Sequence, residues 1–406
     1  MSNAIIIGGG AAGMFASIFL AEQGFSVTLI EKNEKLGKKL FITGKGRCNF
    51  TNDCPPSEFM ENVTGNPKFL YSALSAFPPQ KMIEQLNAWG LKTKVERGNR
   101  AFPESDHAYD VIDVLKKEMK KAGVNVILDT KVEKIIIRGS HVIGVRTDKK
   151  QYDGERVLVA TGGLSYPATG STGDGYRFAK EAGHTVTELY PSLTAISCSD
   201  DFCEQLQGLS LKNVCLSVHR GKKEIFSDFG EMLFTHFGIS GPLVLTASSK
   251  VGPLIGKEDL TAFIDLKPAV DEKKADAHFL RLFAENENRS VENAIRPYFP
   301  SSLVPVVLKC AGLEPEKKVH DITKEERANL ISATKALPLH FSSLRGYEEA
   351  VVTKGGVSVK EIDPKTMESK IVKGLYFIGE VLDADALTGG FNLQIAWSTA
   401  YEAGNS

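Results

Sequence analysis

The chain has 406 residues, a hydrophobic fraction of 42% and a formal net charge of −1. This length exceeds that of one ordinary hydrophobic core and predicts either two domains or one nucleotide-binding domain that carries an insertion. The balanced charge, together with the lack of a long lysine or arginine run, argues against a nucleic-acid partner. No apolar run reaches the roughly 18 residues of a membrane-spanning helix, so we expect no membrane association.

Six cysteines are scattered along the chain without the paired spacing of a zinc site. The N-terminus runs directly into an apolar segment, with no basic region or cleavage site before it, which argues against a signal peptide. We therefore expect reduced thiols, no bound metal and a cytoplasmic location. The sequence leaves the oligomeric state open.

A glycine-rich turn separates the first predicted strand, the apolar run 4–7, from a predicted helix at 14–21. Gly8, Gly10 and Gly13 have the G-x-G-x-x-G spacing that allows a tight turn, a close approach of pyrophosphate to the backbone, and close packing of helix on strand. The free N–H groups at the start of the helix then bind phosphate. The second predicted strand, 26–30, ends on Glu31, which suits ribose hydroxyls and would repel a 2′-phosphate. These features predict a dinucleotide site that does not take NADP.

Three further segments favour FAD over NAD. A second glycine-rich loop with cations follows at 43–49, and a predicted strand at 157–163 ends in glycines. Another predicted strand, 374–380, leads to a glycine-rich segment before the last predicted helix, 395–403, whose N-terminus would direct N–H groups at the N1/O2 edge of a flavin. The residues that we expect to contact FAD lie in these loops and strand ends: Gly8, Gly10, Ala11, Ala12, Gly13, Glu31, Lys32, Lys38, Lys39, Thr43, Gly44, Gly46, Arg47, Cys48, Asn49, Val132, Thr161, Gly162, Gly163, Gly379, Glu380, Asp383, Gly390, Asn392, Leu393 and Gln394.

A second nucleotide motif is missing from the sequence. The segment 170–175 has the wrong glycine spacing and predicts the start of a helix instead. We therefore expect NAD(P)H to act as a transient reductant that docks near the flavin. Alternatively, the flavin receives its electrons from another protein or from the substrate itself.

The segments 8–13, 44–52, 160–175, 234–242 and 379–394 together resemble the BaiN-like family of FAD-dependent oxidoreductases. The piece 172–175 is shared more widely, with fumarate-reductase-type flavoproteins. The resemblance implies an α/β fold: an FAD-binding Rossmann-like domain of three layers (ββα), interrupted by an inserted β-barrel and helical domain. It also implies reduction of enone double bonds in steroid-like bile-acid intermediates or oxidation of small amino-ketones.

The sequence predicts the same organisation independently. Short alternating runs such as 214–218, 231–234 and 263–266 are typical of antiparallel strands, and 271–336 is rich in helix formers. We place the first part of the FAD-binding domain at 1–190, the insert at 191–345 and the second part at 346–406.

Four groups are candidates for the chemistry. Cys48 and Cys54 could form a redox disulfide, although five residues separate them and packing is the simpler explanation for Cys48. His236, in a Gly/Ser/Pro-rich turn of the insert, could transfer the substrate proton or be structural. Arg100 could orient a carboxylate or carbonyl group or form a surface salt bridge. Tyr166 is a further candidate proton donor.

The leading hypothesis is an FAD enzyme that transfers hydride between flavin N5 and a small or steroid-like molecule, as an NAD(P)H-dependent enone reductase. The alternative is an oxidase of primary amines or amino-ketones that releases hydrogen peroxide. A flavin-containing RNA-associated module is a third hypothesis, against which the neutral charge argues.

Overall fold

The computed structural model describes residues 2–406, which form two compact units. The first unit combines the chain up to Ser192 with Tyr347–Ser406, and the second unit is Leu193–Gly346. Each unit has its own hydrophobic core. The chain therefore leaves the first unit once and returns to it.

A five-stranded parallel sheet forms the centre of the first unit, in the order β20-β10-β1-β2-β6. Its strands are β1 (Asn3–Ile7), β2 (Ser26–Ile30), β6 (Asn125–Ile127), β10 (Arg156–Val159) and β20 (Leu375–Phe377). The central strands are buried along nearly their whole length. Continuous apolar runs in the sequence are the expected consequence of a parallel sheet that is covered on both faces.

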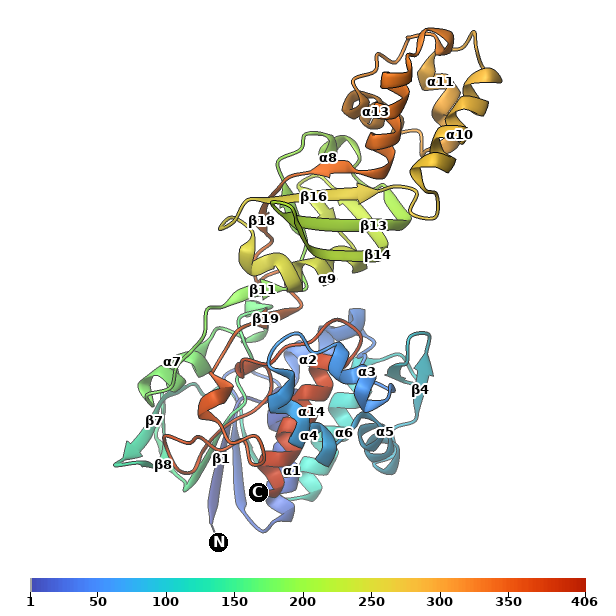
Figure 1. Ribbon diagram of the computed structural model, residues 1–406. Coiled ribbons are helices and arrows are strands. Elements are labelled where there is room, and N and C mark those ends of the chain that lie inside the picture. The colour runs from blue at the N-terminus through green and yellow to red at the C-terminus, as the bar shows by residue number, and fades with distance from the viewer. Residues whose placement is uncertain (1) are drawn as a thin grey trace. The chain divides into compact units, whose positions relative to one another are not determined.

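Helices cover one face of this sheet and a second, antiparallel sheet covers the other (Figure 1). The helices are α1 (Ala11–Glu22), α6 (Ala108–Lys121) and α14 (Phe391–Asn405). The antiparallel strands are β7 (Val132–Arg138), β8 (His141–Thr147) and β9 (Gln151–Asp153). This arrangement confirms the predicted three-layer ββα fold.

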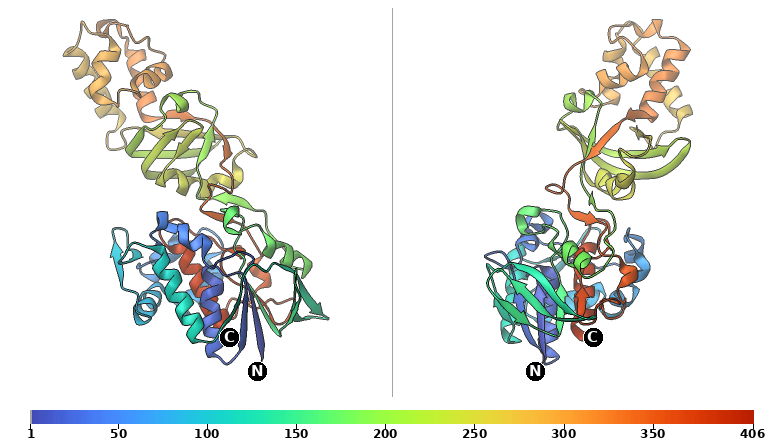
Figure 2. Two further views of the ribbon diagram at one scale, coloured as in Figure 1. Left: turned by 180° about the vertical axis from the view of Figure 1, so that it is seen from behind. Right: turned by 90° about the vertical axis from the view of Figure 1, so that its left-hand side faces the viewer.

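Helices from the two ends of the chain pack side by side (Figure 1 and Figure 2). The Phe15 ring of α1 meets the Trp397 ring of α14 edge to face, with 5.4 Å between ring centroids. The Trp397 indole N–H donates to the carbonyl oxygen of Phe50, at 2.8 Å. Because Trp397 is fully buried, this bond fixes the loop before β3 against the C-terminal helix.

Shorter elements complete the first unit. They are α2 (Lys38–Ile42), the 3-10 turn η1 (Thr43–Gly46), β3 (Thr51–Asn52), α3 (Pro56–Glu61), η2 (Pro67–Leu70), α4 (Tyr71–Ala76), α5 (Pro79–Ala88), β4 (Thr93–Glu96), β5 (Arg100–Pro103), η3 (Pro167–Thr169), α7 (Asp174–Glu181), β11 (Tyr190–Ser192), β19 (Val352–Lys354), η7 (Val359–Glu361) and η8 (Gly379–Val381). Helix α7 begins at Asp174, within the segment 170–175 that was predicted to start a helix. Strands β11 and β19, which lead out of and back into the unit, pair with each other.

The second unit contains a seven-stranded antiparallel sheet in the order β17-β16-β13-β14-β15-β12-β18. Its strands are β12 (Ile196–Cys198), β13 (Ser210–Arg220), β14 (Lys223–Thr235), β15 (Gly238–Ser240), β16 (Leu260–Asp265), β17 (Leu337–Leu339) and β18 (Phe341–Leu344). The alternating runs correctly predicted antiparallel strands. They were also interpreted as a barrel, and the two strands at the ends of the strand order, β17 and β18, are separated in the chain by His340 alone.

Helices complete the second unit and share one hydrophobic core with the sheet. They are α8 (Phe202–Gln205), α9 (Pro242–Val251), η4 (Gly252–Leu254), α10 (Glu272–Ala284), α11 (Val291–Ile295), η5 (Arg296–Tyr298), α12 (Val304–Ala311), η6 (Val319–Asp321) and α13 (Lys324–Lys335). Helix α13 begins with a capping box, in which Thr323 and Glu326 satisfy each other's backbone N–H groups.

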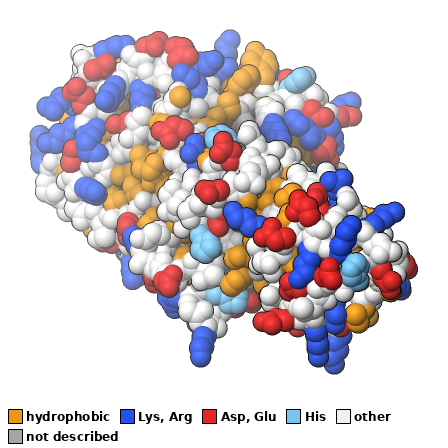
Figure 3. Space-filling view, turned by 90° about the horizontal axis from the view of Figure 1, so that it is seen from above, with side chains coloured by type: hydrophobic (Ala, Val, Ile, Leu, Met, Phe, Trp, Pro, Cys, Tyr) orange, Lys and Arg blue, Asp and Glu red, His pale blue; other side chains and the backbone are white. Residues whose placement is uncertain are grey.

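The surface carries both signs of charge. On the face shown in Figure 3, lysine and arginine side chains are interspersed with aspartate and glutamate side chains. Over residues 2–406, none of the helices combines the length and the apolar character needed to cross a membrane. Within the same residues, no group of three or more His, Cys, Asp or Glu side chains is arranged to hold a metal ion.

Candidate active site

A cavity of about 1000 Å³ lies in the first unit, where the carboxyl ends of β1, β10 and β20 meet the loops that follow them. Every residue that lines it belongs to this unit. Ligands of open α/β sheets bind at this edge because the strand ends and the helix N-termini converge there.

Most of the residues that we expected to contact FAD line this single cavity. They are Gly8, Gly10, Ala11, Ala12, Glu31, Lys32, Lys38, Lys39, Thr43, Gly44, Arg47, Asn49, Val132, Thr161, Gly162, Glu380, Gly390, Asn392 and Leu393. Seven of the expected residues are absent from the lining: Gly13, Gly46, Cys48, Gly163, Gly379, Asp383 and Gln394. The structure thus joins segments from the start, the middle and the end of the chain.

The glycines of the first turn have two different roles. A side chain at Gly8 or Gly13 would collide with backbone, since a Cβ on Gly8 meets the Ala160 carbonyl and one on Gly13 meets the Gly8 carbonyl. These two glycines allow close packing of helix α1 on the sheet. A Cβ on Gly10 would meet no protein atom within 4 Å, and Gly10 lines the cavity. Open space at the N-terminus of a helix fits a pyrophosphate.

The carboxylate of Glu31 is held firmly at the end of β2. Its Oε2 accepts the Gly9 N–H at 2.7 Å, and its Oε1 accepts the backbone and side-chain N–H groups of Asn33 at 2.8 and 2.7 Å. A carboxylate has enough lone pairs to accept further hydrogen bonds from ribose hydroxyls. This position fits the predicted role of Glu31.

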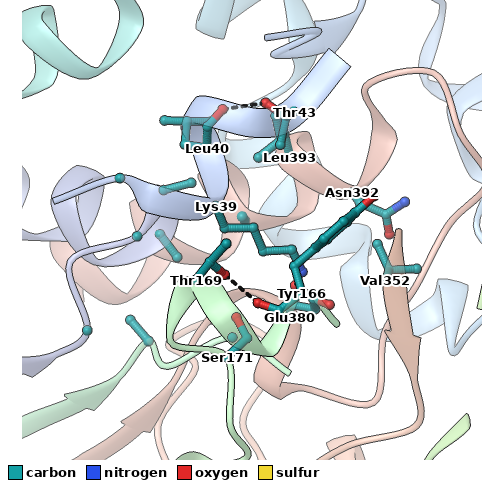
Figure 4. Close-up of a pocket in the computed structure, with 18 of the residues that line it drawn as sticks. Lys39, Leu40, Thr43, Tyr166, Thr169, Ser171, Val352, Glu380, Asn392 and Leu393 are labelled. Atoms are coloured by element: carbon teal, nitrogen blue, oxygen red, sulfur yellow. Dashed lines mark hydrogen bonds and ion pairs between the residues drawn. The ribbon is translucent and has the colours of Figure 1, made fainter. Parts of the chain in front are cut away.

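A polar network forms one wall of the cavity (Figure 4). Lys39 Nζ donates to Glu380 Oε2 at 2.7 Å and to Ser165 Oγ at 2.6 Å. Glu380 Oε1 in turn accepts from Ser165 Oγ at 2.9 Å and from the Thr353 N–H at 3.0 Å. The network joins four separate chain segments around the cavity, so it can position a cofactor whose parts bind to each of them.

Three other expected cationic residues are paired with carboxylates. Lys32 contacts Asp174 at 2.6 Å and Lys38 contacts Glu34 at 3.2 Å. Arg47 contacts two carboxylates, and its guanidinium lies 4.1 Å from the centroid of the Phe102 ring. These pairs neutralise part of the positive charge near the cavity.

The loop after α2 turns through left-handed backbone at Gly44, Lys45, Gly46 and Cys48. This conformation buries the Cys48 side chain completely and leaves the residue outside the cavity lining, so its contact with FAD stays a prediction. Burial also raises the pKa of the Cys48 thiol to about 12 and that of Cys54 to about 11. Both are free thiols with little thiolate character, which agrees with packing rather than with a redox disulfide.

The loop before α14 approaches the cavity through Gly389 and Gly390, both with positive φ. A Cβ at Gly390 would collide with the backbone of Thr51, so only glycine allows the N-terminus of α14 to lie here. Gln394 lies one turn further on. It is fully buried, and its amide bonds to Thr51, Phe77 and Ser398. The Gln394 side chain thus anchors the helix, and a cofactor contact of this residue stays a prediction.

The remaining expected residues outside the lining also have structural roles. Gly13 allows helix packing, and a Cβ on Gly163 would collide with Thr353. Gly379 begins the turn η8 with φ 71°, and the Asp383 backbone N–H donates to Val357. Gly46 turns the loop with φ 85°.

Three buried side-chain oxygens beside the cavity have no hydrogen-bond partner in the described part of the chain: Asn49 Oδ1, Asn52 Oδ1 and Thr161 Oγ1. All three residues line the cavity. An unpaired buried acceptor is costly, so its presence indicates a bound group with donors. The residues present therefore fit FAD, whose ring carries an N–H group. Asn52 was missed in the sequence, although it closes the glycine-rich segment 44–52.

The structure places two of the three catalytic candidates at the cavity. Tyr166 is half-buried and lines it, and its ring lies near Lys39, Glu380 and Asn392 in Figure 4. Arg100 also lines it but is exposed, and its Nε donates to the Arg97 carbonyl at 3.1 Å. His236 is exposed in the turn between β14 and β15 of the second unit, outside the lining.

Comparison with known proteins identifies the family of the chain. Residues 2–406 match the family described as HI0933-like protein Rossmann domain. The chain is 30% identical over 410 residues to the 3-dehydro-bile acid delta(4,6)-reductase of Clostridium scindens, covering 100% of this chain and 99% of the relative. It is 33% identical over 406 residues to the ribosomal RNA dihydrouridine synthase of Haemophilus influenzae, covering 98% and 97%.

Among solved structures, the 3-ketosteroid delta1-dehydrogenase of Sterolibacterium denitrificans aligns with a TM-score of 0.52 at 13% identity, covering 100% of this chain and 99% of that one. At this identity the likeness shows a shared fold and nothing about the substrate. The full-length family match and the glycine-lined cavity lead to one conclusion: the chain belongs to the HI0933-like Rossmann-domain family, within which it is BaiN-like, and it is an FAD-dependent oxidoreductase.

Proposed function

We propose that the protein reduces a C=C bond conjugated to a carbonyl group, and that its substrate is a uracil base in RNA. The names of the two full-length relatives support the first part. A 3-oxo-4,6-diene steroid and uridine both contain such a bond, and the dihydro product of uridine lacks it. The observation that carries the proposal is the single cavity in which the glycine turn, the α14 N-terminus and Tyr166 meet.

FAD, when bound and reduced, supplies a hydride from N5. The reaction adds this hydride to the carbon distant from the carbonyl and a proton to the adjacent carbon, so a proton donor is required. Tyr166 is the best placed of the three sequence candidates, because it lines the cavity and is half-buried, whereas Arg100 is exposed and His236 lies outside the lining. We propose NADH or NADPH as the reductant of the flavin.

A uracil in RNA requires contacts to phosphate. The balanced net charge predicted no nucleic-acid partner, but net charge does not exclude a few local phosphate contacts. Lys45 and Arg100 both line the cavity and are exposed, and neither forms an ion pair within residues 2–406. We propose that these two cations bind phosphates on either side of the target base.

A steroid-like enone is the second candidate substrate, because the Clostridium scindens relative carries that activity in its name. The two substrates share the reaction and differ in charge. A steroid has no phosphates, so its reduction would not depend on Lys45 or Arg100.

The test starts from the FAD-loaded enzyme, whose flavin is reduced anaerobically with NADH or NADPH. Reduction is followed as a loss of absorbance at about 450 nm. The reduced enzyme is then mixed separately with a ribosomal RNA transcript and with a 3-oxo-4,6-diene steroid. We expect the transcript to restore the flavin absorbance and to acquire dihydrouridine, detected by mass spectrometry of its nucleosides. Restoration by the steroid alone would overturn the RNA assignment. Peroxide release with primary amines or amino-ketones would favour the oxidase alternative.

A further inference from the structure

The side chain of Asn52 is fixed between two loops. It closes β3 and is only 4% exposed. Its Nδ2 donates to the carbonyl oxygens of Gly98 and Gly389, each at 3.0 Å. Both N–H groups of the amide are therefore used, while Oδ1 is buried and has no partner in the described residues.

The orientation of this amide follows from its neighbours. If the nitrogen and oxygen were exchanged, an oxygen would face two carbonyl oxygens, which cannot donate. The two carbonyls therefore require the Nδ2 on their side. Asn52 lines the cavity, and within the described residues Oδ1 is the one polar atom of its side chain without a partner.

The neighbouring N-terminus of α14 restricts which donors and acceptors a molecule bound at Asn52 can present. Gly389 lies next to Gly390, which precedes the N-terminus of α14, where free N–H groups suit ring acceptors. The oxidised isoalloxazine ring has acceptors at N1, O2, O4 and N5, and its single N–H donor is at N3, between O2 and O4. Asn52 Oδ1 is the unpartnered acceptor whose own side chain is bonded to the α14 loop, at Gly389, so an acceptor beside a set of helix N–H donors matches this edge of the ring.

We propose that Asn52 is a positioning residue for the flavin: its Oδ1 accepts the N3–H of the ring, and so fixes the pyrimidine edge against the α14 N-terminus. This inference concerns the cofactor and does not depend on the substrate proposed above. The Nδ2 of the same amide donates to Gly98 in the β4–β5 turn and to Gly389 in the loop before α14. The side chain that contacts the ring therefore also fixes the positions of these two loops.

The first test uses the unaltered protein. Apo-enzyme is titrated with FAD and with N3-methyl FAD, which lacks the N3–H, and binding is followed by flavin fluorescence. We expect the methylated cofactor to bind at least about tenfold more weakly. Equal affinity for the two cofactors would overturn the proposal, whatever the protein's activity.

The second test assigns the acceptor. FAD isotope-labelled at N3 is bound to the wild type, to Asn52→Leu, and to Asn66→Ala as a control. Asn66 also donates an amide bond to a backbone carbonyl, that of Asp383, but it is exposed and does not line the cavity. We expect slow exchange of the N3 proton with solvent in the wild type and in Asn66→Ala, and fast exchange in Asn52→Leu. Slow exchange in FAD-loaded Asn52→Leu would contradict the assignment. If that variant fails to bind FAD, the methylated-cofactor result decides.

Discussion

Lys39 and Glu380 lie 341 residues apart in the chain and form an ion pair of 2.7 Å at the wall of the cavity. Both side chains are 21% exposed, so the pair is partly shielded from solvent. It connects α2 to the turn that follows β20. The two parts of the first unit, separated in sequence by the second unit, are thus held together at the wall of the cavity.

Replacing Glu380 by glutamine should destabilise this wall. Glu380→Gln keeps an oxygen for the Thr353 N–H but leaves the Lys39 cation partly buried without its partner, at a cost of about 1–3 kcal/mol. The melting temperature of the FAD-loaded enzyme should fall by several degrees. The matched control is Glu34→Gln, because the Glu34 carboxylate pairs with Lys38 but is 58% exposed. That variant should change stability by less than about 1 kcal/mol. Equal losses in the two variants would contradict the role of the Lys39–Glu380 pair.

Two glycines of the first turn should respond differently to the same substitution. Gly10→Ala places its methyl group in open space within the cavity, so the apo-protein should keep its stability within about 0.5 kcal/mol while the affinity for FAD falls at least about tenfold. Gly13→Ala overlaps the Gly8 carbonyl and should destabilise the apo-protein by about 1–3 kcal/mol. Denaturant unfolding of both apo-proteins and FAD titration separate the two effects. A destabilised Gly10→Ala apo-protein would show that Gly10 is a packing residue.

Stability of the first unit should fall in mild acid because of His184. Burial lowers the pKa of this imidazole, and the nearby Glu361 carboxylate opposes the shift only in part. The unfolded chain takes up the proton near pH 6.5, whereas the folded state does so only at lower pH. Between these two pKa values the unfolded state binds more protons than the folded state. The free energy of unfolding therefore falls by up to about 1.4 kcal/mol for each unit by which the pH is lowered.

Melting temperatures from pH 7 to pH 5 check this dependence. Wild type and the exposed-histidine control His320→Gln should lose stability in parallel, and His184→Gln should lose less. An unchanged slope in His184→Gln would exclude His184 as the cause.

Loss of Lys45 or Arg100 should weaken RNA binding without affecting the flavin. For Arg100→Ala, and likewise for Lys45→Ala, we expect KM for an RNA substrate to rise about tenfold and the salt dependence to weaken. The rate of flavin reduction by NAD(P)H should stay within about twofold, since neither side chain pairs with the polar network of Lys39. Steady-state kinetics at several salt concentrations measure both quantities. An unchanged KM in both variants would mean that phosphates are bound elsewhere.

The central sheet was the most predictable part of the fold. The predicted strand 26–30 coincides with β2, because parallel strands buried on both faces leave continuous apolar runs in the sequence. The first glycine turn was equally clear, since a side chain at Gly8 or Gly13 would collide with backbone and Gly10 faces the open space of the cavity. Strand pairing in the second unit was less predictable, because alternation identifies antiparallel strands but not whether their sheet closes.

Side-chain direction limited the prediction of the site. Cys48 and Gln394 lie next to residues that line the cavity, yet a left-handed backbone at Cys48 and the helical turn after Gly390 direct both side chains into the core. Asn52, in contrast, lines the cavity but was not among the residues expected to contact FAD. The orientation of its amide is set by two carbonyl groups from distant loops, those of Gly98 and Gly389, and the sequence does not show that these loops meet.

The measurement that tests the central claim most directly is a single turnover of the reduced enzyme on RNA. FAD-loaded protein is reduced anaerobically, freed of excess NAD(P)H and mixed with a ribosomal RNA transcript while absorbance at about 450 nm is recorded. The account predicts that the oxidised flavin returns and that one dihydrouridine forms for each flavin reoxidised. A flavin that stays reduced with the transcript and with the 3-oxo-4,6-diene steroid alike would contradict the assignment of the protein as a reductase of conjugated double bonds.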